Sequence, residues 1–158
     1  MKLLRESIRM ILREAEGDRT SCPLPTQDLE LNTKNRNAAI KSEHIEYGPL
    51  NLADEDYWEH LAEHWGTSTE VAKQSVCGNC AAFDISPRML ECMPGEVQDP
   101  DGRLGYCWMH SFKCHSARSC YTHAMGGPIT TDRVSLSWAE KSQGVMGEGR
   151  RRHLRVLG

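Results

Sequence analysis

The chain has 158 residues, 26% of which are charged, and its formal net charge at neutral pH is −3. This length accommodates one domain, or one small core with arms. Proteins dedicated to nucleic-acid binding are usually basic, so the charge argues against that class. No apolar stretch approaches the roughly 20 residues that a membrane span requires. The chain holds only two phenylalanines but seven cysteines.

The N-terminal segment, residues 1–17, predicts an amphipathic helix. Leu4, Ile8 and Ile11 fall on one stripe at helical spacing, and basic residues occupy much of the remainder. The stripe can pack on the chain's own domain, dock on a partner protein or lie on a membrane surface, and the interleaved glutamates weaken the last option. No apolar run typical of a secretory signal is present. We therefore expect a reducing cytoplasm, where disulfides are rare.

Residues 18–50 show little periodicity and are interrupted by prolines, glycine and asparagines. The pattern allows a short helix over residues 34–45. An irregular segment of this length rarely fits inside a compact monomer. We expect an extended arm that becomes ordered by lying against a partner.

Stronger helix signals follow the arm. Asp54 can cap a helix whose apolar stripe ends at Trp65, and Gly66 supplies the C-terminal cap position. Thr67 and Glu70 fit a capping box that opens a second, short helix. These signals predict two consecutive helices before the first cysteine pair.

The C-terminal half contains turns and isolated elements. Ser86-Pro87 predicts the start of a short helix, and residues 95–105 read as a loop around the turn Asp99-Pro100-Asp101-Gly102. Alternating apolar residues over 134–138 suggest one short strand. A basic run near the C-terminus is expected to contact an acidic neighbouring subunit or to form a disordered tail, rather than to bind DNA. That run begins with Arg150, Arg151 and Arg152.

Six of the seven cysteines lie within the segment from Cys77 to Cys120. Cys77 and Cys80 form a C-x2-C pair, whose thiolates can point at one ion or cluster. Two cysteines from distant loops would complete four-fold coordination of zinc or of a 4Fe–4S cluster. The candidates for these two positions are Cys92, Cys107, Cys114 and Cys120. Cys22 stands far from the others, and we expect it to remain outside any pairing.

The residues between the cysteines support two different cofactors. Five of the ten aromatic residues lie between the cysteines or next to the last one, and could shield a cluster from water. They are Phe83, Tyr106, Trp108, Phe112 and Tyr121. The spacings Cys107-x2-His110 and Cys120-x2-His123 instead suit zinc. Spacing alone leaves both cofactors open.

The segment 77–108 contains a C-x2-C pair followed by an aromatic residue, a cysteine before Pro94-Gly95, and a cysteine after Gly105-Tyr106. In this order of motifs it resembles the signature of high-potential iron–sulfur proteins. The resemblance implies a 4Fe–4S cubane in a small, loop-rich fold. The ligands that it implies are Cys77, Cys80, Cys92 and Cys107. The additional Cys114 and Cys120 depart from that signature.

A second set of motifs covers more of the chain. It runs from Cys22-Pro-Leu-Pro through Cys77-Gly-Asn-Cys80 and Leu104-Gly-Tyr-Cys107 to Gly126-Gly-Pro128. Together these motifs are similar to small cysteine-rich virion structural proteins of tailed bacteriophages, of the marine and cyanobacterial myophage type. The similarity implies a tail, baseplate or neck component, made in the host cytoplasm and present in several copies in a symmetric assembly.

The second resemblance also implies a different ligand set. Aligning the last cysteine with the Cys-x2-aromatic ending of those proteins selects Cys77, Cys80, Cys107 and Cys120. We favour this set, because its last two members keep a spacing close to that of the iron–sulfur signature. Cys92 and Cys114 then become alternates, and are expected to be buried free thiols or a close pair.

The sequence therefore predicts a small, mostly α and irregular fold, with a loop-rich, cluster-stapled domain over residues 51–130. Extended arms precede it and follow it, the latter over residues 131–158. We expect a structural, non-enzymatic role in which the arms bind other virion proteins. A cluster would supply stability that a core with few large apolar residues lacks. A soluble iron–sulfur electron-transfer protein and a zinc-binding adaptor module are the alternatives.

Overall fold

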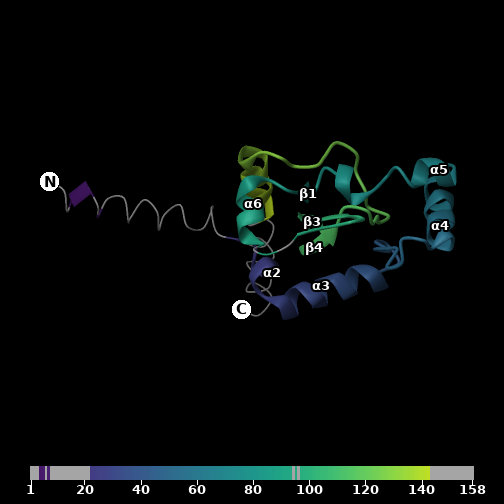
Figure 1. The fold of residues 1–158 in the computed structure, drawn as a ribbon, viewed down its shortest axis with the longest axis horizontal. Coiled ribbons are helices and arrows are strands. Elements are labelled where there is room, and N and C mark those ends of the chain that lie inside the picture. Colours follow the sequence, from purple (N-terminus) through teal and green to yellow (C-terminus); the bar gives the residue numbers. More distant parts are fainter. Residues whose placement is uncertain (1–3, 6, 8–21, 94, 96, 143–158) are drawn as a thin grey trace, which may run out of the picture.

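The computed structural model of the chain describes residues 4, 5, 7, 22–93, 95 and 97–142. In this part, helices surround a small antiparallel sheet (Figure 1). Of the predicted N-terminal helix, Leu4 is helical and 63% exposed. The other two residues of its apolar stripe, Ile8 and Ile11, lie outside the described residues. The basic run at Arg150, Arg151 and Arg152 also lies outside them.

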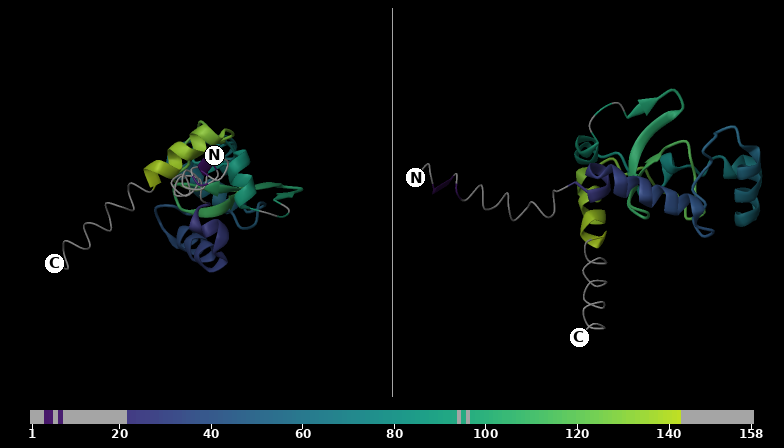
Figure 2. Two further views of the ribbon diagram at one scale, coloured as in Figure 1. Left: turned by 90° about the vertical axis from the view of Figure 1, so that its left-hand side faces the viewer. Right: turned by 90° about the horizontal axis from the view of Figure 1, so that it is seen from below.

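Residues 22–50 pack on the domain, so the prediction of an extended arm is wrong for this stretch. They form α2 (Leu24–Gln27) and α3 (Leu29–Lys41), and α3 runs along one side of the sheet (Figures 1 and 2). The asparagines that suggested turns instead bond to the backbone near β4. Asn32 Oδ1 accepts from Lys113 N at 2.7 Å, and Asn35 Nδ2 donates to Ser111 O at 2.7 Å.

The segment after α3 also joins the core. Tyr47 is buried and packs edge-on against Phe112, with ring centroids 4.8 Å apart. Gly48 and Ser119 exchange backbone hydrogen bonds of 3.0 and 2.6 Å. This pairing brings the chain around residue 120 next to a region more than 70 residues earlier in the sequence.

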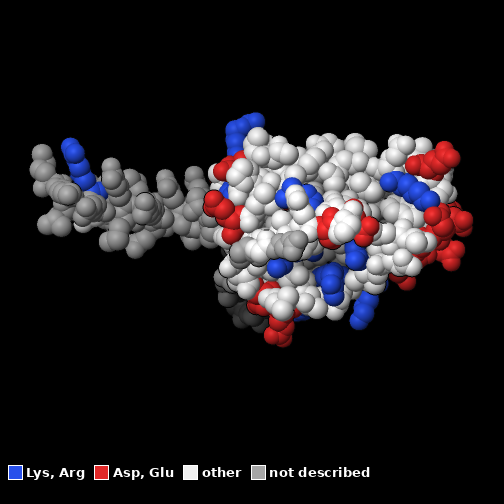
Figure 3. Space-filling model, in the orientation of Figure 1, with Lys and Arg blue, Asp and Glu red and all other residues white. Residues whose placement is uncertain are grey.

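The next two helices form a lobe at one end of the molecule (Figure 1). Asp54 caps α4 (Glu55–Trp65) and Gly66 ends it with a φ of 63°, as predicted. The following helix, α5 (Thr69–Ala72), is capped by Ser68, whose side chain accepts from Val71 N, so the predicted capping box was misplaced by one residue. Acidic side chains gather over this lobe (Figure 3). On α4 the exposed ones are Glu55, Asp56, Glu59 and Glu63.

The sheet was largely missed by the sequence analysis. Its strands are β1 (Phe83–Asp84), β2 (Gln98–Asp99), β3 (Gly102–Cys107) and β4 (Phe112–His115). β3 pairs antiparallel with each of the other three. The turn at Asp99 was predicted correctly, and its Oδ1 accepts from two backbone N–H groups at 2.9 Å. The flanking residues, expected to be loop, form the β2–β3 hairpin.

Two further helices flank the sheet. α6 (Pro87–Cys92) begins after Ser86, whose hydroxyl accepts from Met89 N at 3.4 Å, as its sequence predicted. Residues 132–142 are helical, so the strand predicted over 134–138 is wrong. Thr131 begins this helix, and Ser135 and Ala139, one helical turn apart, are buried. The first part of the predicted C-terminal arm therefore packs on the domain.

These elements make a small mixed domain, with more sheet than the mostly α and irregular fold that the sequence predicted. The main apolar core lies between the sheet, α3 and α6, and a second, smaller one lies under α4 and α5. In the described ranges, no helix has the length and apolarity that crossing a bilayer requires.

Candidate metal centre

Five cysteines from three separate parts of the chain line one small cavity. None of the five takes part in a disulfide, and all except Cys107 are buried. They are Cys77, Cys80, Cys107, Cys114 and Cys120. The other lining side chains are Phe83, Met109, His110 and His123. The predicted ligands Cys77, Cys80, Cys107 and Cys120 are thus brought together, along with the alternate Cys114.

The C-x2-C pair sits on a tight turn, η1 (Cys77–Asn79), closed by a hydrogen bond from Cys80 N to Cys77 O of 3.0 Å. Cys77 N donates to Arg118 O at 2.7 Å, and Gly78 N donates to Ser116 O at 2.9 Å. These two bonds hold the chain that leads to Cys120 beside the turn. The spacing therefore positions the first two thiols, and long-range backbone pairing brings the last one to them.

A glycine allows the loop after Cys120 to close over the same turn. Ala81 N donates to Ala124 O at 2.7 Å, and Gly127 N donates to Asn79 O at 3.0 Å. A Cβ atom on Gly127 would lie 1.8 Å from Cys80 O, so no larger residue fits without displacing the backbone. Gly126-Gly127-Pro128, noted in the sequence only as a turn, thus packs against the turn that carries the C-x2-C pair.

The other two thiols come from the β3–β4 hairpin. Cys107 ends β3, and Cys114 lies on β4 opposite Gly105. The hairpin turn places Met109 and His110 at the cavity. It ends at Ser111, which has a φ of 56°, and Ser111 N donates to Cys107 O at 2.9 Å. Strand pairing, which the sequence did not reveal, therefore decides that Cys114 faces the same cavity as Cys107.

Backbone N–H groups point at three of the sulfur atoms. The donors are Ala82 and Ala124 to Cys80, Met109 and His110 to Cys107, and Thr122 to Cys120. Such hydrogen bonds stabilise a thiolate and tune a metal bound to it. The Cys114 side chain is hydrogen-bonded to those of Cys107 and Cys77.

Burial is the main cause of the pKa shifts of Cys80, Cys114 and Cys120. It raises the pKa of Cys80, and it raises the pKa of Cys120 to about 12. Burial also raises the pKa of Cys114 far above its ordinary value, whereas the hydrogen bond from Cys114 lowers the pKa of Cys107. A bound cation reverses this balance, because thiols lose their protons when they coordinate a metal.

The two histidines at the cavity are hydrogen-bonded to neighbouring side chains. His110 Nε2 lies 2.6 Å from Thr122 Oγ1, which is 3.2 Å from Cys120 Sγ. His123 Nε2 lies 2.6 Å from Asn79 Oδ1. Burial lowers the pKa of both histidines, which favours the neutral imidazole. Thr122 and Asn79 are partners that the sequence analysis missed, although Asn79 stands inside the C-x2-C motif.

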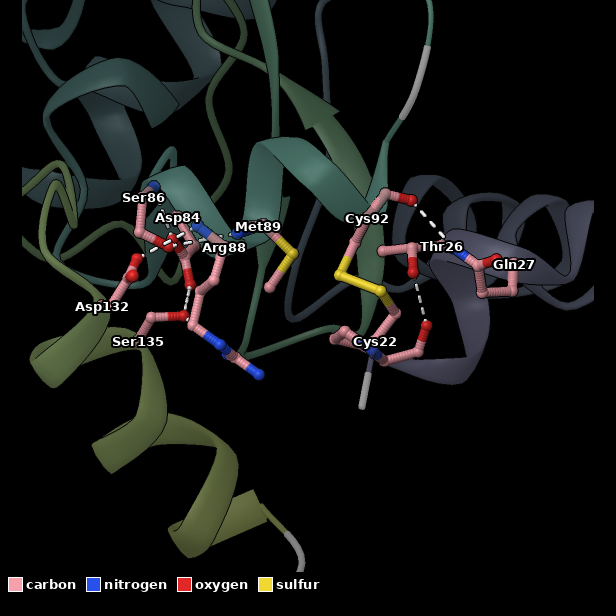
Figure 4. Close-up of a disulfide and its surroundings, with 11 residues drawn as sticks. Cys22, Thr26, Gln27, Asp84, Ser86, Arg88, Met89, Cys92, Asp132 and Ser135 are labelled. Atoms are coloured by element: carbon pink, nitrogen blue, oxygen red, sulfur yellow. Dashed lines mark hydrogen bonds between the residues drawn. A yellow bond between two sulfur atoms is a disulfide. The ribbon is translucent and has the colours of Figure 1, made fainter. Parts of the chain in front are cut away.

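Cys92 is not part of this site, because it forms a disulfide with Cys22 (Figure 4). This corrects two predictions: Cys22 is not outside every pairing, and Cys92 is neither a free thiol nor a partner of Cys114. It also removes the ligand set that the iron–sulfur signature implied, since that set requires Cys92. The two residues are 70 positions apart, and no motif linked them.

Within the part of the chain that the structure describes, no three Cys, His, Asp or Glu side chains are placed to hold one metal ion. Comparison with protein-family models, with curated proteins and with solved structures found no match for this chain.

Proposed function

We propose that this chain is a structural component of a tailed-phage particle, whose small domain is stabilised by a 4Fe–4S cluster in the five-cysteine cavity. The observation that carries the proposal is the convergence of five free thiols from three parts of the chain. Thiolates are the ligands that such clusters take. The cofactor and the location are separate claims, and they are tested separately below.

The proposed ligands are Cys77, Cys80, Cys107 and Cys120. The backbone donors to the last three support this choice, because each sulfur is already placed to accept hydrogen bonds as a thiolate. The fifth thiol, Cys114, would remain protonated and donate to Cys107, which agrees with the direction of both pKa shifts. Bound there, the cluster would supply four covalent links among η1, the end of β3 and the loop at Cys120.

Two features bear on the ligand set and the cofactor. Nε2 of His110 and Nε2 of His123 are both occupied by hydrogen bonds to side chains, which favours a set of four thiolates, suited to a cluster or to zinc, over a set that includes these histidines. Phe83, which lines the cavity, is 1% exposed and shields one side of it from water. Shielding matters for a cluster, because solvent exposure is one of the factors that set its potential.

A zinc-binding module is the second candidate, and the observation that favours it is the size of the cavity. Its volume is about 10 Å³, which is room for about one water-sized group. A single ion held by four of the thiols would stabilise the fold in the same way, since structural zinc contributes folding free energy directly. The choice of cofactor therefore requires measurement.

The first experiment is anaerobic purification of the full chain from iron-replete cells, followed by visible absorption spectroscopy and analysis of iron, acid-labile sulfide and zinc. We expect a brown protein with about four irons per chain. A colourless protein with one zinc would overturn the cluster and establish the second candidate. Reversible reduction and reoxidation without loss of iron would favour the electron-transfer alternative over a purely structural cluster.

The proposed location in a virion is supported by the resemblance of the sequence motifs to those of phage structural proteins. Exposed leucines near the N-terminal end of the described domain are consistent with contacts to neighbouring subunits. Leu24 and Leu29 are 66% and 73% exposed. Mass spectrometry and antibody labelling of phage particles banded in a density gradient test this claim. Detection in the lysate but never in banded particles would overturn it.

A further inference from the structure

The disulfide lies where the described domain begins. Cys22 opens the first long described segment, and its partner Cys92 is the last residue of α6. Figure 4 shows the bond joining α6 to the residues just before α2. Neither cysteine lines the cavity. The chain therefore places its disulfide and its free thiols in separate environments.

Residues 22–28 are called the strap. Within the described part of the chain, few polar contacts besides the disulfide hold them, apart from the bonds by which Asp28 caps α3. Gln27 Nε2 donates to Cys92 O at 2.9 Å. The Thr26 hydroxyl and the Thr26 N–H both bond within the strap, to Pro23 O. Pro25 and Thr26 are buried, but Leu24 is exposed. The disulfide is thus the covalent anchor of a short segment with limited contacts of its own.

The helix that follows is capped by Asp28 of the strap, but beyond its first turn it is held by contacts outside the strap. Asn32 and Asn35 bond to the backbone of residues 111–113, and Ala39 is buried in the main core. Opening the disulfide would therefore release the strap while α3 stays on the sheet. Local opening of this kind is expected where a segment has few buried contacts.

We propose that the Cys22–Cys92 pair is a redox-controlled latch for the strap. In the closing step the two thiols reduce a small-molecule disulfide: one sulfur–sulfur bond forms between Cys22 and Cys92, and the oxidant leaves as two thiols that carry the two protons. In the opening step a dithiol reductant is oxidised to a disulfide. The Cys22–Cys92 bond breaks, and the two protons of the reductant pass to the two cysteine sulfurs. Cys22 is half-buried, so the thiolate of a reductant can reach its sulfur.

Whether the Cys22–Cys92 pair is reduced or oxidised depends on the thiol redox conditions around the protein. A cytoplasmic thiol pool keeps the pair reduced, and an oxidising exterior closes it. If the proposed virion role is correct, the strap is free during assembly and becomes fixed after release. The chemistry of the latch itself depends neither on that role nor on what the cavity binds.

Hydrogen–deuterium exchange of the full chain, read by mass spectrometry, tests the proposal. One sample is oxidised with a small-molecule disulfide and the other is reduced with a dithiol, and alkylation reports the state of each cysteine. On reduction we expect the amides of Thr26 and Asp28 to exchange about tenfold faster, while those of α3 beyond Asn32 stay unchanged. Equal exchange in the two samples would overturn the latch.

Variants separate the latch from a general effect of the reductant. C22S should exchange like the reduced wild type under both conditions, and C92S provides the same test from the other side. Metal content is measured in every sample, so loss of the cofactor is recognised separately. If Cys22 remains alkylatable after oxidation while the protein is folded by circular dichroism, the pair does not close and the proposal fails.

Discussion

The end of the domain around α6 and the cysteine cavity are held together in different ways. At the α6 end, the stabilising hydrogen bonds and the disulfide form between groups of the chain itself and need no cofactor. The carboxylate of Asp84, which is fully buried, accepts from Ser86 N at 2.8 Å and from the Ser135 hydroxyl (Figure 4). It also accepts from Trp108 Nε1 at 2.9 Å. The Cys22–Cys92 disulfide closes the same end. At the cavity, five thiols share one space without a covalent bond between them.

This difference separates two sources of stability. The α6 end joins β1, β3, α6 and the helix at 132–142 through hydrogen bonds and one disulfide, all of which exist without a cofactor. The cavity joins η1, the β3–β4 hairpin and the loop at Cys120, whose thiols are the proposed ligands of the cofactor. A change at the α6 end should therefore leave metal binding at the cavity intact.

The largest effect is expected from C107S. Under the proposed ligand set, this change removes one of four thiolates, so we expect loss of most of the bound metal and of cooperative folding. The measurements are iron and zinc per chain and circular dichroism after anaerobic purification.

C114S is the matched control for C107S, because Cys114 lies on the neighbouring strand and lines the same cavity. It should keep the metal and the fold, since a serine hydroxyl can still donate to the Cys107 sulfur. The reverse pattern, with metal lost in C114S and retained in C107S, would exchange the roles assigned to the two residues.

Breaking the disulfide should cost less and should spare the metal. A cross-link across 70 residues restricts the unfolded chain enough to contribute about 4 kcal/mol in the chain-entropy model. We expect C22A to lower the free energy of unfolding by about 2–4 kcal/mol in a denaturant titration. The metal content should equal that of the wild type. A variant that lost the metal along with the disulfide would show that the two regions are coupled.

D84A tests the hydrogen bonds at the same end. It leaves Ser86 N, Trp108 Nε1 and the Ser135 hydroxyl without their shared acceptor in a dry environment. A buried donor left without a partner costs about 1–3 kcal/mol, so we expect a loss of about 3 kcal/mol or more. S135A removes one of these donors and should cost about 1 kcal/mol. Equal losses in a denaturant titration would mean that the carboxylate does not organise the other two groups.

The features that could be predicted from the sequence are those formed by residues close together in the chain. The caps of α4 and α6 and the turn at Asp99 were predicted correctly, because the residues that form them are three or four positions apart. The convergence of the predicted ligand thiols agrees with the motifs, since both resemblances placed Cys77, Cys80 and Cys107 at one site.

Long-range pairings were not visible in the sequence. The Cys22–Cys92 bond and the contacts of Asn32 and Asn35 with the residues before Cys114 depend on the path of the whole chain. The same holds for the sheet, since β3 shows no alternation of buried and exposed residues and β4, which does alternate, is only four residues long. Asparagine was read as a turn residue, although its side-chain amide can equally satisfy the backbone of a neighbouring strand.

The smallest effect is expected at the exposed turn of the β2–β3 hairpin. His115 Nε2 lies 2.9 Å from Asp99 Oδ2, and this hydrogen bond lowers the pKa of Asp99. A carboxyl group with a lowered folded-state pKa adds stability above its unfolded pKa of about 3.9, and that stability is lost as the pH falls through the folded-state pKa. D99N should therefore have a lower Tm than the wild type at pH 7, with the gap closing as the pH falls below about 4. D101N, on the same exposed turn, is the matched control and should track the wild type throughout. A gap that persisted in acid would mean that Asp99 acts through its two backbone hydrogen bonds rather than through its charge.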